Sequence, residues 1–202
     1  MPFNKTIKKN RGQKRKVFTK KHYQSNDGMM TAIWGPSFWH VLHTISFNYP
    51  INPTYRDKKH YRDYVLNLKH VLPCKYCRIN VKKNFKTMPL TMKHMKNRNT
   101  FSRYIYRLHE LINKMLGKQS GLTYEAVRER YEHFRARCTQ TREQQENIAE
   151  VRVEKGCTEP LSGKKAKCIL HIVPQEKKSK TFKIDRCCLK RKKRNQTKKS
   201  RK

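Results

Sequence analysis

The chain has 202 residues, and its 50 lysines and arginines stand against only 14 acidic residues, which gives a formal net charge of +36. Apolar residues make up 35% of the sequence, and no run approaches the roughly 20 apolar residues that a membrane-spanning helix requires. This composition argues against a membrane-spanning protein and predicts strong, salt-sensitive attraction to polyanions such as nucleic acid, an anionic membrane surface or an acidic protein.

The charge and the aromatic residues divide the chain into three parts. Residues 1–30 and 141–202 are rich in lysine and arginine, so we expect basic, largely disordered arms. Residues 31–140 hold most of the aromatic residues and are expected to form one domain. The amino-terminal arm lacks the apolar segment of a secretory signal. We therefore expect a cytosolic chain, in which seven cysteines are more typical of redox or metal chemistry than of a structural disulfide framework.

Two helices are predicted in the first half of the domain. Apolar residues recur at helical spacing from Trp34 to Phe47, and the segment 48–53, with two prolines, should end this first helix. A second helix is expected after Thr54, whose hydroxyl can cap it, and Pro73 should stop it.

Three further helices follow. A third is predicted over about 74–85, and a fourth over 101–116, where the apolar stripe is clearest. We expect Thr100 to cap the fourth helix and Gly117 to end it, and Thr123 to open a short fifth helix. No strand is expected before residue 150, so the predicted fold class is all-α. Beyond it, the β-prone runs 168–173 and 181–184 are compatible with a short hairpin.

Cys74 and Cys77 form a C-x-x-C pair at the predicted start of the third helix. Thiols at this spacing can close a small disulfide ring, and a helix N-terminus with Lys75 and Arg78 nearby favours a thiolate. The pair therefore has the character of a redox-active dithiol. It could also be half of a zinc site, but zinc requires two further ligands, and the chain has no second C-x-x-C. A thioredoxin-type motif would follow a strand, whereas this pair lies between helices.

Four motifs in order resemble the FAD-dependent sulfhydryl oxidases of the Erv/ALR family. They are Trp39 followed by Leu42-His43, then Tyr49-Pro50, then Leu72-Pro73-Cys74-Lys75-Tyr76-Cys77, and finally His109 to Asn113 with Leu116-Gly117-Lys118. The resemblance covers about residues 34–138, and the versions in large cytoplasmic DNA viruses are similar in length and style. It implies a four-helix bundle plus a short fifth helix, with FAD in the mouth of the bundle.

The resemblance also implies roles for the matched residues toward FAD. Trp39 would pack against the adenine or the flavin, and His43 and His109 would hydrogen-bond to the cofactor or stack on it. Asn113 would anchor the adenine end, and Lys118 would lie near the phosphates. Glu110 stands where the family has asparagine; because a carboxylate near phosphates is unfavourable, we expect it to point outward and leave it out of the site.

The implied mechanism is thiol oxidation at the C-x-x-C pair. Cys77 would be the sulfur next to the flavin, and Cys74 the outer thiol that exchanges with a protein dithiol or a thioredoxin-like relay. Electrons would pass from the substrate to the disulfide, to FAD and then to O₂, giving hydrogen peroxide. The resemblance further implies a homodimer, and its viral character implies a late protein of the host cytoplasm, the virus factory and the virion.

The other cysteines leave several interpretations open. Cys187 and Cys188, on the basic arm, could form a shuttle that relays oxidising equivalents, as could Cys157 with Cys168; a tail disulfide or free thiols are equally compatible with the sequence. Cys138 follows the fifth helix without the partner that the family usually has.

The main alternative function is a basic nucleic-acid-binding protein whose C-x-x-C is structural or binds zinc. The net charge of +36 supports it, and bound flavin or zinc in the purified protein would distinguish the two.

Overall fold

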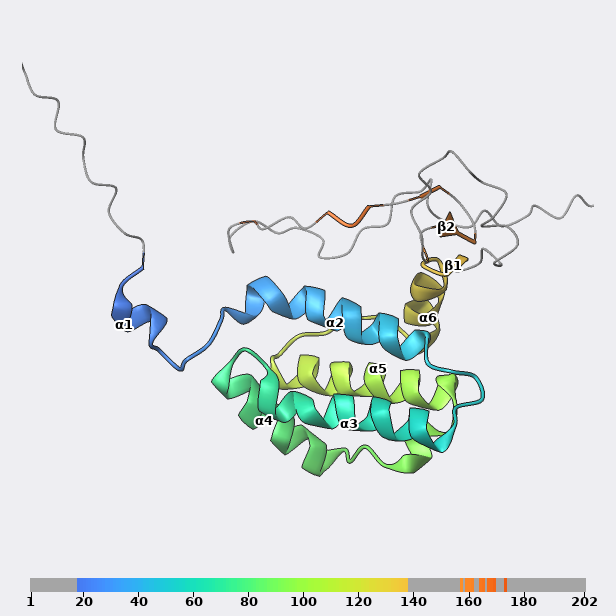
Figure 1. The fold of residues 1–202 in the computed structure, drawn as a ribbon, viewed down its shortest axis with the longest axis horizontal. Coiled ribbons are helices and arrows are strands. Elements are labelled where there is room, and N and C mark those ends of the chain that lie inside the picture. The colour runs from blue at the N-terminus through green and yellow to red at the C-terminus, as the bar shows by residue number, and fades with distance from the viewer. Residues whose placement is uncertain are drawn as a thin grey trace, which may run out of the picture.

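The computed structural model describes residues 18–137, 157, 159–161, 164–165, 167–169 and 173. Helices dominate this part of the chain (Figure 1). In chain order the elements are α1 (Lys20–Tyr23), α2 (Thr31–Phe47), α3 (Tyr55–Val71), α4 (Lys75–Thr87), the 3₁₀ turn η1 (Met92–Met95), α5 (Arg98–Met115), α6 (Tyr124–Glu132), β1 (Ala136–Arg137) and β2 (Glu159–Pro160).

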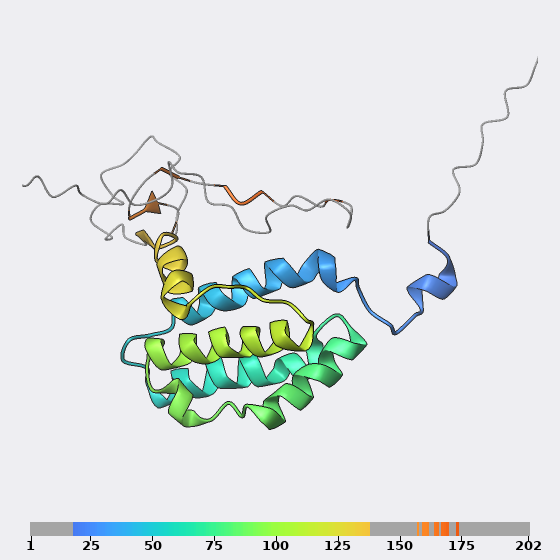
Figure 2. The same ribbon diagram turned by 180° about the vertical axis from the view of Figure 1, so that it is seen from behind.

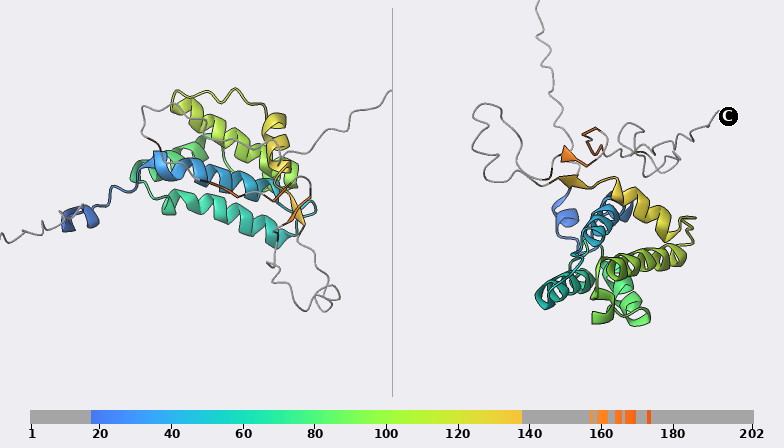
Figure 3. Two further views of the ribbon diagram at one scale, coloured as in Figure 1. Left: turned by 90° about the horizontal axis from the view of Figure 1, so that it is seen from above. Right: turned by 90° about the vertical axis from the view of Figure 1, so that its right-hand side faces the viewer.

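Four helices form the bundle, and α6 is the short fifth helix, so the all-α prediction is confirmed. Helix α2 packs against α5 and α6, and α4 packs against both α3 and α5. Figure 2 shows α6 crossing the end of α2, whereas the one-turn α1 lies away from the bundle. Figure 3 shows the same arrangement from above (left) and from one end (right). Within the described residues, no helix is long and apolar enough to cross a membrane.

The helix caps follow the local sequence with one exception. Thr54 and Asp57 form a capping box at the start of α3, and the Thr123 hydroxyl accepts a hydrogen bond from the Ala126 N–H at the start of α6. The cap of α5 is Asn97, so the prediction of Thr100 was wrong. Asparagine is a strong N-cap, and Thr100, three residues on, completes a reciprocal box with it.

The core lies between α2, α3, α4 and α5. Its largest fully buried side chains include Tyr49, Phe101 and Ile105, each with no exposed surface. Burying one such side chain stabilises the fold by roughly 1.5–3 kcal/mol. The Tyr49 hydroxyl is also satisfied, because it donates a hydrogen bond of 2.9 Å to the Met95 carbonyl. This core holds α2 and α5 together, and those two helices carry four of the predicted cofactor residues: Trp39, His43, His109 and Asn113.

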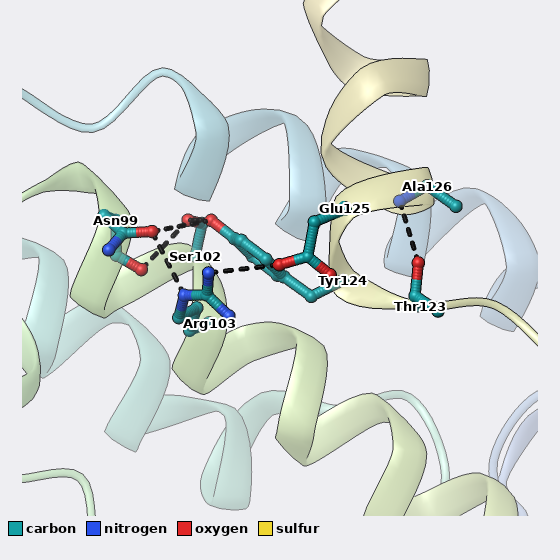
Figure 4. Close-up of polar contacts among 7 residues, drawn as sticks. All are labelled: Asn99, Ser102, Arg103, Thr123, Tyr124, Glu125 and Ala126. Carbon is teal, nitrogen blue, oxygen red and sulfur yellow. Dashed lines mark hydrogen bonds and ion pairs between the residues drawn. The ribbon is translucent and has the colours of Figure 1, made fainter.

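Helix α6 is fixed to α5 chiefly through Tyr124 (Figure 4). The hydroxyls of Tyr124 and Ser102 are 2.7 Å apart, and the Arg103 guanidinium lies over the Tyr124 ring, 4.0 Å from its centroid. Arg103 also pairs with Glu125 at 3.2 Å. Because α6 is held in this way, Tyr131 near its end lies beside the histidines of α2.

The described residues include a two-stranded antiparallel ladder, so the expectation of no strand before residue 150 was wrong. Ala136 pairs with Pro160 and Arg137 with Glu159. Strands of two residues have no periodic pattern that a sequence could show. Of the expected hairpin, Cys168, Ile169 and Val173 are described and lie outside any strand, and 181–184 lies outside the described residues.

Candidate active site

Cys74 and Cys77 form a disulfide at the N-terminus of α4. Cys74 is the N-cap residue, and its sulfur accepts a hydrogen bond of 3.2 Å from the Cys77 backbone N–H. Backbone N–H groups and the positive end of the helix dipole both favour a thiolate at this position. The structure therefore provides the environment of a reducible disulfide, as the sequence predicted.

The two cysteines differ in their surroundings. Both cysteines are half-buried, but it is Cys77 that packs against the core of the bundle, where Trp34, Phe38 and Trp39 also pack. Tyr76, between the cysteines, is 75% exposed. The Arg78 guanidinium donates a hydrogen bond to the Leu72 carbonyl, which places a positive charge in the loop before the disulfide.

A segment that sequence reasoning missed contacts this loop. The Met29 N–H donates to the Pro73 carbonyl at 2.6 Å, and the Lys75 N–H donates to the Asp27 carbonyl at 3.3 Å. Between them, Gly28 forms an antiparallel bridge with Cys74. We call residues 27–31 the strap.

Gly28 is required at this contact for two reasons. Its φ is +103°, a conformation that residues with a side chain rarely adopt. A Cβ at this position would also stand 2.5 Å from the Pro73 carbonyl oxygen and 2.8 Å from the Cys74 Cα. The glycine itself was the only local signal of this contact in the sequence.

Three of the residues predicted to bind the cofactor come together from two helices. Trp39 of α2 stacks on His109 of α5, with ring centroids 3.9 Å apart and planes within 5°. The Nε2 of His43 lies 3.0 Å from the Nδ1 of His109, so one of these nitrogens donates and the other accepts. Tyr131 of α6, which sequence reasoning did not select, lies beside His43 with ring centroids 5.3 Å apart.

Both histidines of this cluster are held neutral. His43 is 4% exposed, and burial, followed by the nearby His109 and His40, lowers its pKa to about 3. Burial lowers the pKa of His109 to about 4, although Glu110 acts in the opposite direction. Protonation would place a charge in a poorly solvated site. The cluster therefore presents neutral, flat aromatic surfaces.

The remaining predicted cofactor residues lie at the end of α5. The Asn113 side-chain amide donates to the Glu110 carboxylate at 3.1 Å. Residues three apart lie on one helix face, so Glu110 and Asn113 share a face of α5; the expectation that Glu110 points away from the cofactor stays a prediction. The backbone N–H of Lys118 donates to the Asn113 carbonyl at 2.8 Å, and the Lys118 side chain is exposed.

Two of the cysteines outside the C-x-x-C pair lie among the described residues. Cys157 is disulfide-bonded and Cys168 is a free, exposed thiol, so the alternative pairing of Cys157 with Cys168 is not formed. Cys138, Cys187 and Cys188 lie outside the described residues. In the part of the chain that the structure describes, no group of three or more histidine, cysteine or acidic residues is placed to hold a metal ion.

The cluster has the chemistry to hold an aromatic cofactor such as FAD. Trp39 and His109 offer flat rings on which a ring system could pack. The Nδ1 of His43 is buried and has no hydrogen-bond partner. Because a buried polar atom without a partner is costly, this nitrogen fits a site completed by a polar ligand atom.

Comparison with known proteins gives concordant results. The model of the Erv1 / Alr family matches residues 36–137. The chain is 36% identical over 95 residues to a probable FAD-linked sulfhydryl oxidase of Acanthamoeba polyphaga mimivirus, a match that covers 46% of this chain and 66% of that protein. It is 30% identical over 86 residues to the FAD-linked sulfhydryl oxidase of an African swine fever virus isolate, covering 43% of this chain and 70% of that protein.

A further relative and one solved structure extend the comparison. A putative FAD-linked sulfhydryl oxidase of Invertebrate iridescent virus 6 is 31% identical over 90 residues, covering 43% of this chain and 81% of that protein. The crystal structure of the yeast Erv1 core has 21% sequence identity and a TM-score of 0.46, covering 61% of this chain and 96% of that chain.

Proposed function

This chain belongs to the Erv1/Alr family of FAD-linked sulfhydryl oxidases, and from that membership we propose that its Cys74–Cys77 disulfide oxidises protein dithiols. FAD would return the cysteines to the disulfide and pass the electrons to O₂, which leaves as hydrogen peroxide. The single observation that carries the proposal is the Cys74–Cys77 disulfide, closed at a helix N-terminus with a backbone N–H on the Cys74 sulfur.

The thiol chemistry can be written in two exchange steps. A substrate thiolate attacks the Cys74 sulfur, the Cys74–Cys77 bond breaks, and Cys77 leaves as a thiolate with the electron pair. The second substrate thiolate then attacks the substrate sulfur of the mixed disulfide and releases the Cys74 thiolate. The products are one substrate disulfide and one reduced C-x-x-C pair, so electrons and atoms balance.

The neutral aromatic cluster would hold the cofactor. When bound, FAD supplies a two-electron acceptor for the reduced cysteine pair. The Trp39 and His109 rings offer packing surfaces, and the hydrogen bond between His43 and His109 fixes the orientation of both imidazoles. Lys118 would contribute an exposed cation suited to phosphate. The amide of Asn113 is oriented by its hydrogen bond to the Glu110 carboxylate.

An absorption spectrum tests this function directly. The purified protein should show the visible bands of bound flavin, and a dithiol added without oxygen should bleach them as electrons reach the cofactor. Admission of air should restore the bands and produce hydrogen peroxide. A protein that remains colourless after incubation with FAD would refute the proposal.

We further propose a setting for the enzyme. The named relatives from three groups of large DNA viruses support a late viral protein that acts in the host cytoplasm or virus factory and enters the virion. Exposed apolar side chains of α2 and α3, Val41, Tyr64 and Val71, support a homodimer, which sedimentation would test. The substrate would be a protein dithiol or a thioredoxin-like relay.

The net charge of +36 favours a second, compatible activity. The basic arms could hold the oxidase domain at nucleic acid or another anionic surface, with an affinity that falls steeply as salt rises. Binding of a DNA duplex at several salt concentrations, compared between the full chain and a chain lacking residues 141–202, would test this.

A further inference from the structure

Thr31, the first residue of α2, brings its hydroxyl to both sulfurs of the disulfide. Its Oγ1 lies 3.9 Å from the Cys74 sulfur and 3.7 Å from the Cys77 sulfur, within the range of hydrogen bonds to sulfur. None of the motifs recognised in the sequence includes this residue.

The two sulfurs share the Thr31 hydroxyl but differ in their backbone neighbours. The Cys74 sulfur accepts a backbone N–H at the start of α4, 3.2 Å away, so a thiolate on Cys74 is stabilised by the helix itself. The Cys77 sulfur is oriented toward the core and has the Thr31 hydroxyl beside it. A thiolate on Cys77 would thus draw on Thr31 as its hydrogen-bond donor.

The strap fixes the Thr31 hydroxyl at this place. Its backbone is hydrogen-bonded to the residues on either side of Cys74: the Met29 N–H donates to the Pro73 carbonyl, and the Asp27 carbonyl accepts from the Lys75 N–H. The Trp34 indole N–H donates to the Met29 carbonyl at 3.2 Å, which ties the strap to the first turns of α2. No cysteine precedes Cys74 in the chain, so the strap does not itself carry electrons.

We propose that Thr31 is a catalytic residue that donates a hydrogen bond to the Cys77 sulfur as this sulfur leaves the disulfide. The proposal rests on the oxidase function proposed above. The step is the first exchange: the substrate sulfur bonds to Cys74, the Cys74–Cys77 bond breaks, and the electron pair remains on Cys77. The Thr31 proton stays on its oxygen and is shared with the new thiolate.

Two measurable consequences follow. A hydrogen bond to the charged form lowers the pKa of the Cys77 thiol, and a thiol of lower pKa leaves a disulfide faster. Stabilising the reduced form also makes the disulfide a stronger oxidant. Removal of the hydroxyl should reverse both effects, whereas a serine in its place should preserve them.

The first experiment measures the Cys77 thiol alone. In full-length, FAD-loaded protein carrying Cys74→Ser, with oxygen excluded and the flavin chemically reduced, the rate of Cys77 alkylation by iodoacetamide is followed against pH by mass spectrometry. Thr31→Val should raise the midpoint of this profile by about one pH unit, a tenfold change in the ionisation constant, and Thr31→Ser should leave it unchanged. The exposed free thiol of Cys168 is an internal reference that should be alkylated at the same rate in all three proteins.

The second experiment uses the intact disulfide, equilibrated in glutathione buffers of graded potential. The disulfide of Thr31→Val should be harder to reduce, so that half-reduction requires a more reducing glutathione buffer, and Thr31→Ser should match the parent protein. Identical profiles for valine and threonine in both experiments would overturn the role of Thr31, as would a serine variant that behaves like valine. The second experiment requires no flavin, so its result can be distinguished from a failure of the oxidase function, which would show as a parent protein that binds no flavin.

Discussion

The imidazole of His109 lies flat against the indole of Trp39, with ring centroids 3.9 Å apart and planes within 5°. The contact joins α5 to α2, and the hydrogen bond between His109 and His43 extends it into the core. Because the pair of imidazoles is buried, the cluster can accept a proton only at a cost, and this has consequences for stability as well as for cofactor binding.

Stability should fall as the pH drops below the ordinary histidine range. Burial lowers the pKa of His43 to about 3 and that of His109 to about 4, against 6.5 for an unperturbed histidine. Between those pKa values the unfolded chain binds protons that the folded protein does not, so the free energy of unfolding rises with pH. The rise ends above about pH 6.5, where the histidines are neutral in both states. Each unit of difference corresponds to about 1.4 kcal/mol.

Urea unfolding of the FAD-free protein between pH 4.5 and pH 8, the pH values chosen to span roughly this window, measures the effect. A His109→Gln variant is the control, because it removes one titrating group and should flatten the curve. A free energy of unfolding that does not change across the window in the parent protein would show that the histidines are not held neutral.

The redox pair should be indispensable for turnover. Cys74→Ser or Cys77→Ser leaves a single thiol that cannot close the disulfide, so oxidation of small dithiols by O₂ should be abolished in either variant. Oxygen consumption with dithiothreitol as substrate measures this. Cys168→Ser, which removes an exposed free thiol, is the matched control and should retain the parent rate. Turnover by both single variants would contradict the assignment.

The helices could be predicted because their signals are local. Thr54 and Thr123 each precede a helix with a side chain that caps it, and the sequence shows both. At α5 two candidates stand three residues apart, and both take part in the cap; only the backbone conformation of Asn97 shows which one begins the helix. The ladder of β1 and β2 has two residues in each strand, too few for any pattern.

The site was predictable only in part. The resemblance grouped Trp39, His43 and His109, and the structure brings them into contact. The approach of Gly28 and Thr31 to the disulfide depends on how the chain returns across the start of α4, which is a tertiary contact between residues more than 40 positions apart. No local pattern encodes such a contact, and composition placed Gly28 in the basic arm 1–30 and Thr31 at the first position of the domain.

Gly28→Ala should disrupt the strap and impair the disulfide. The new Cβ would meet the Pro73 oxygen at 2.5 Å and the Cys74 Cα at 2.8 Å, and these are backbone atoms that cannot turn aside. We expect a loss of about 1–3 kcal/mol in the free energy of unfolding and slower reduction of the disulfide by dithiothreitol, because Thr31 would no longer be held in place.

Gly121→Ala is the matched control for this substitution. Gly121 also has a positive φ, +63°, but nothing lies within 4 Å of the position of its Cβ. Its substitution should therefore cost only the backbone strain, about 1 kcal/mol, and leave the reduction rate of the disulfide unchanged. If the two alanine variants lose equal stability and their disulfides are reduced at equal rates, the strap does not constrain the C-x-x-C loop.

Cys187 and Cys188 should matter for large substrates only. A small dithiol reaches the half-buried Cys74 directly, whereas the thiols of a protein substrate are hindered by the bulk of its chain, and a cysteine pair on a basic arm could carry oxidising equivalents to them. Double substitution by serine should slow oxidation of a reduced, unfolded-chain substrate such as ribonuclease while leaving the rate with dithiothreitol unchanged. Cys168→Ser is again the control, since it removes a thiol without removing the pair. If the double variant oxidises both substrates at the parent rate, the shuttle is excluded. If it oxidises both more slowly, the pair supports the core disulfide instead.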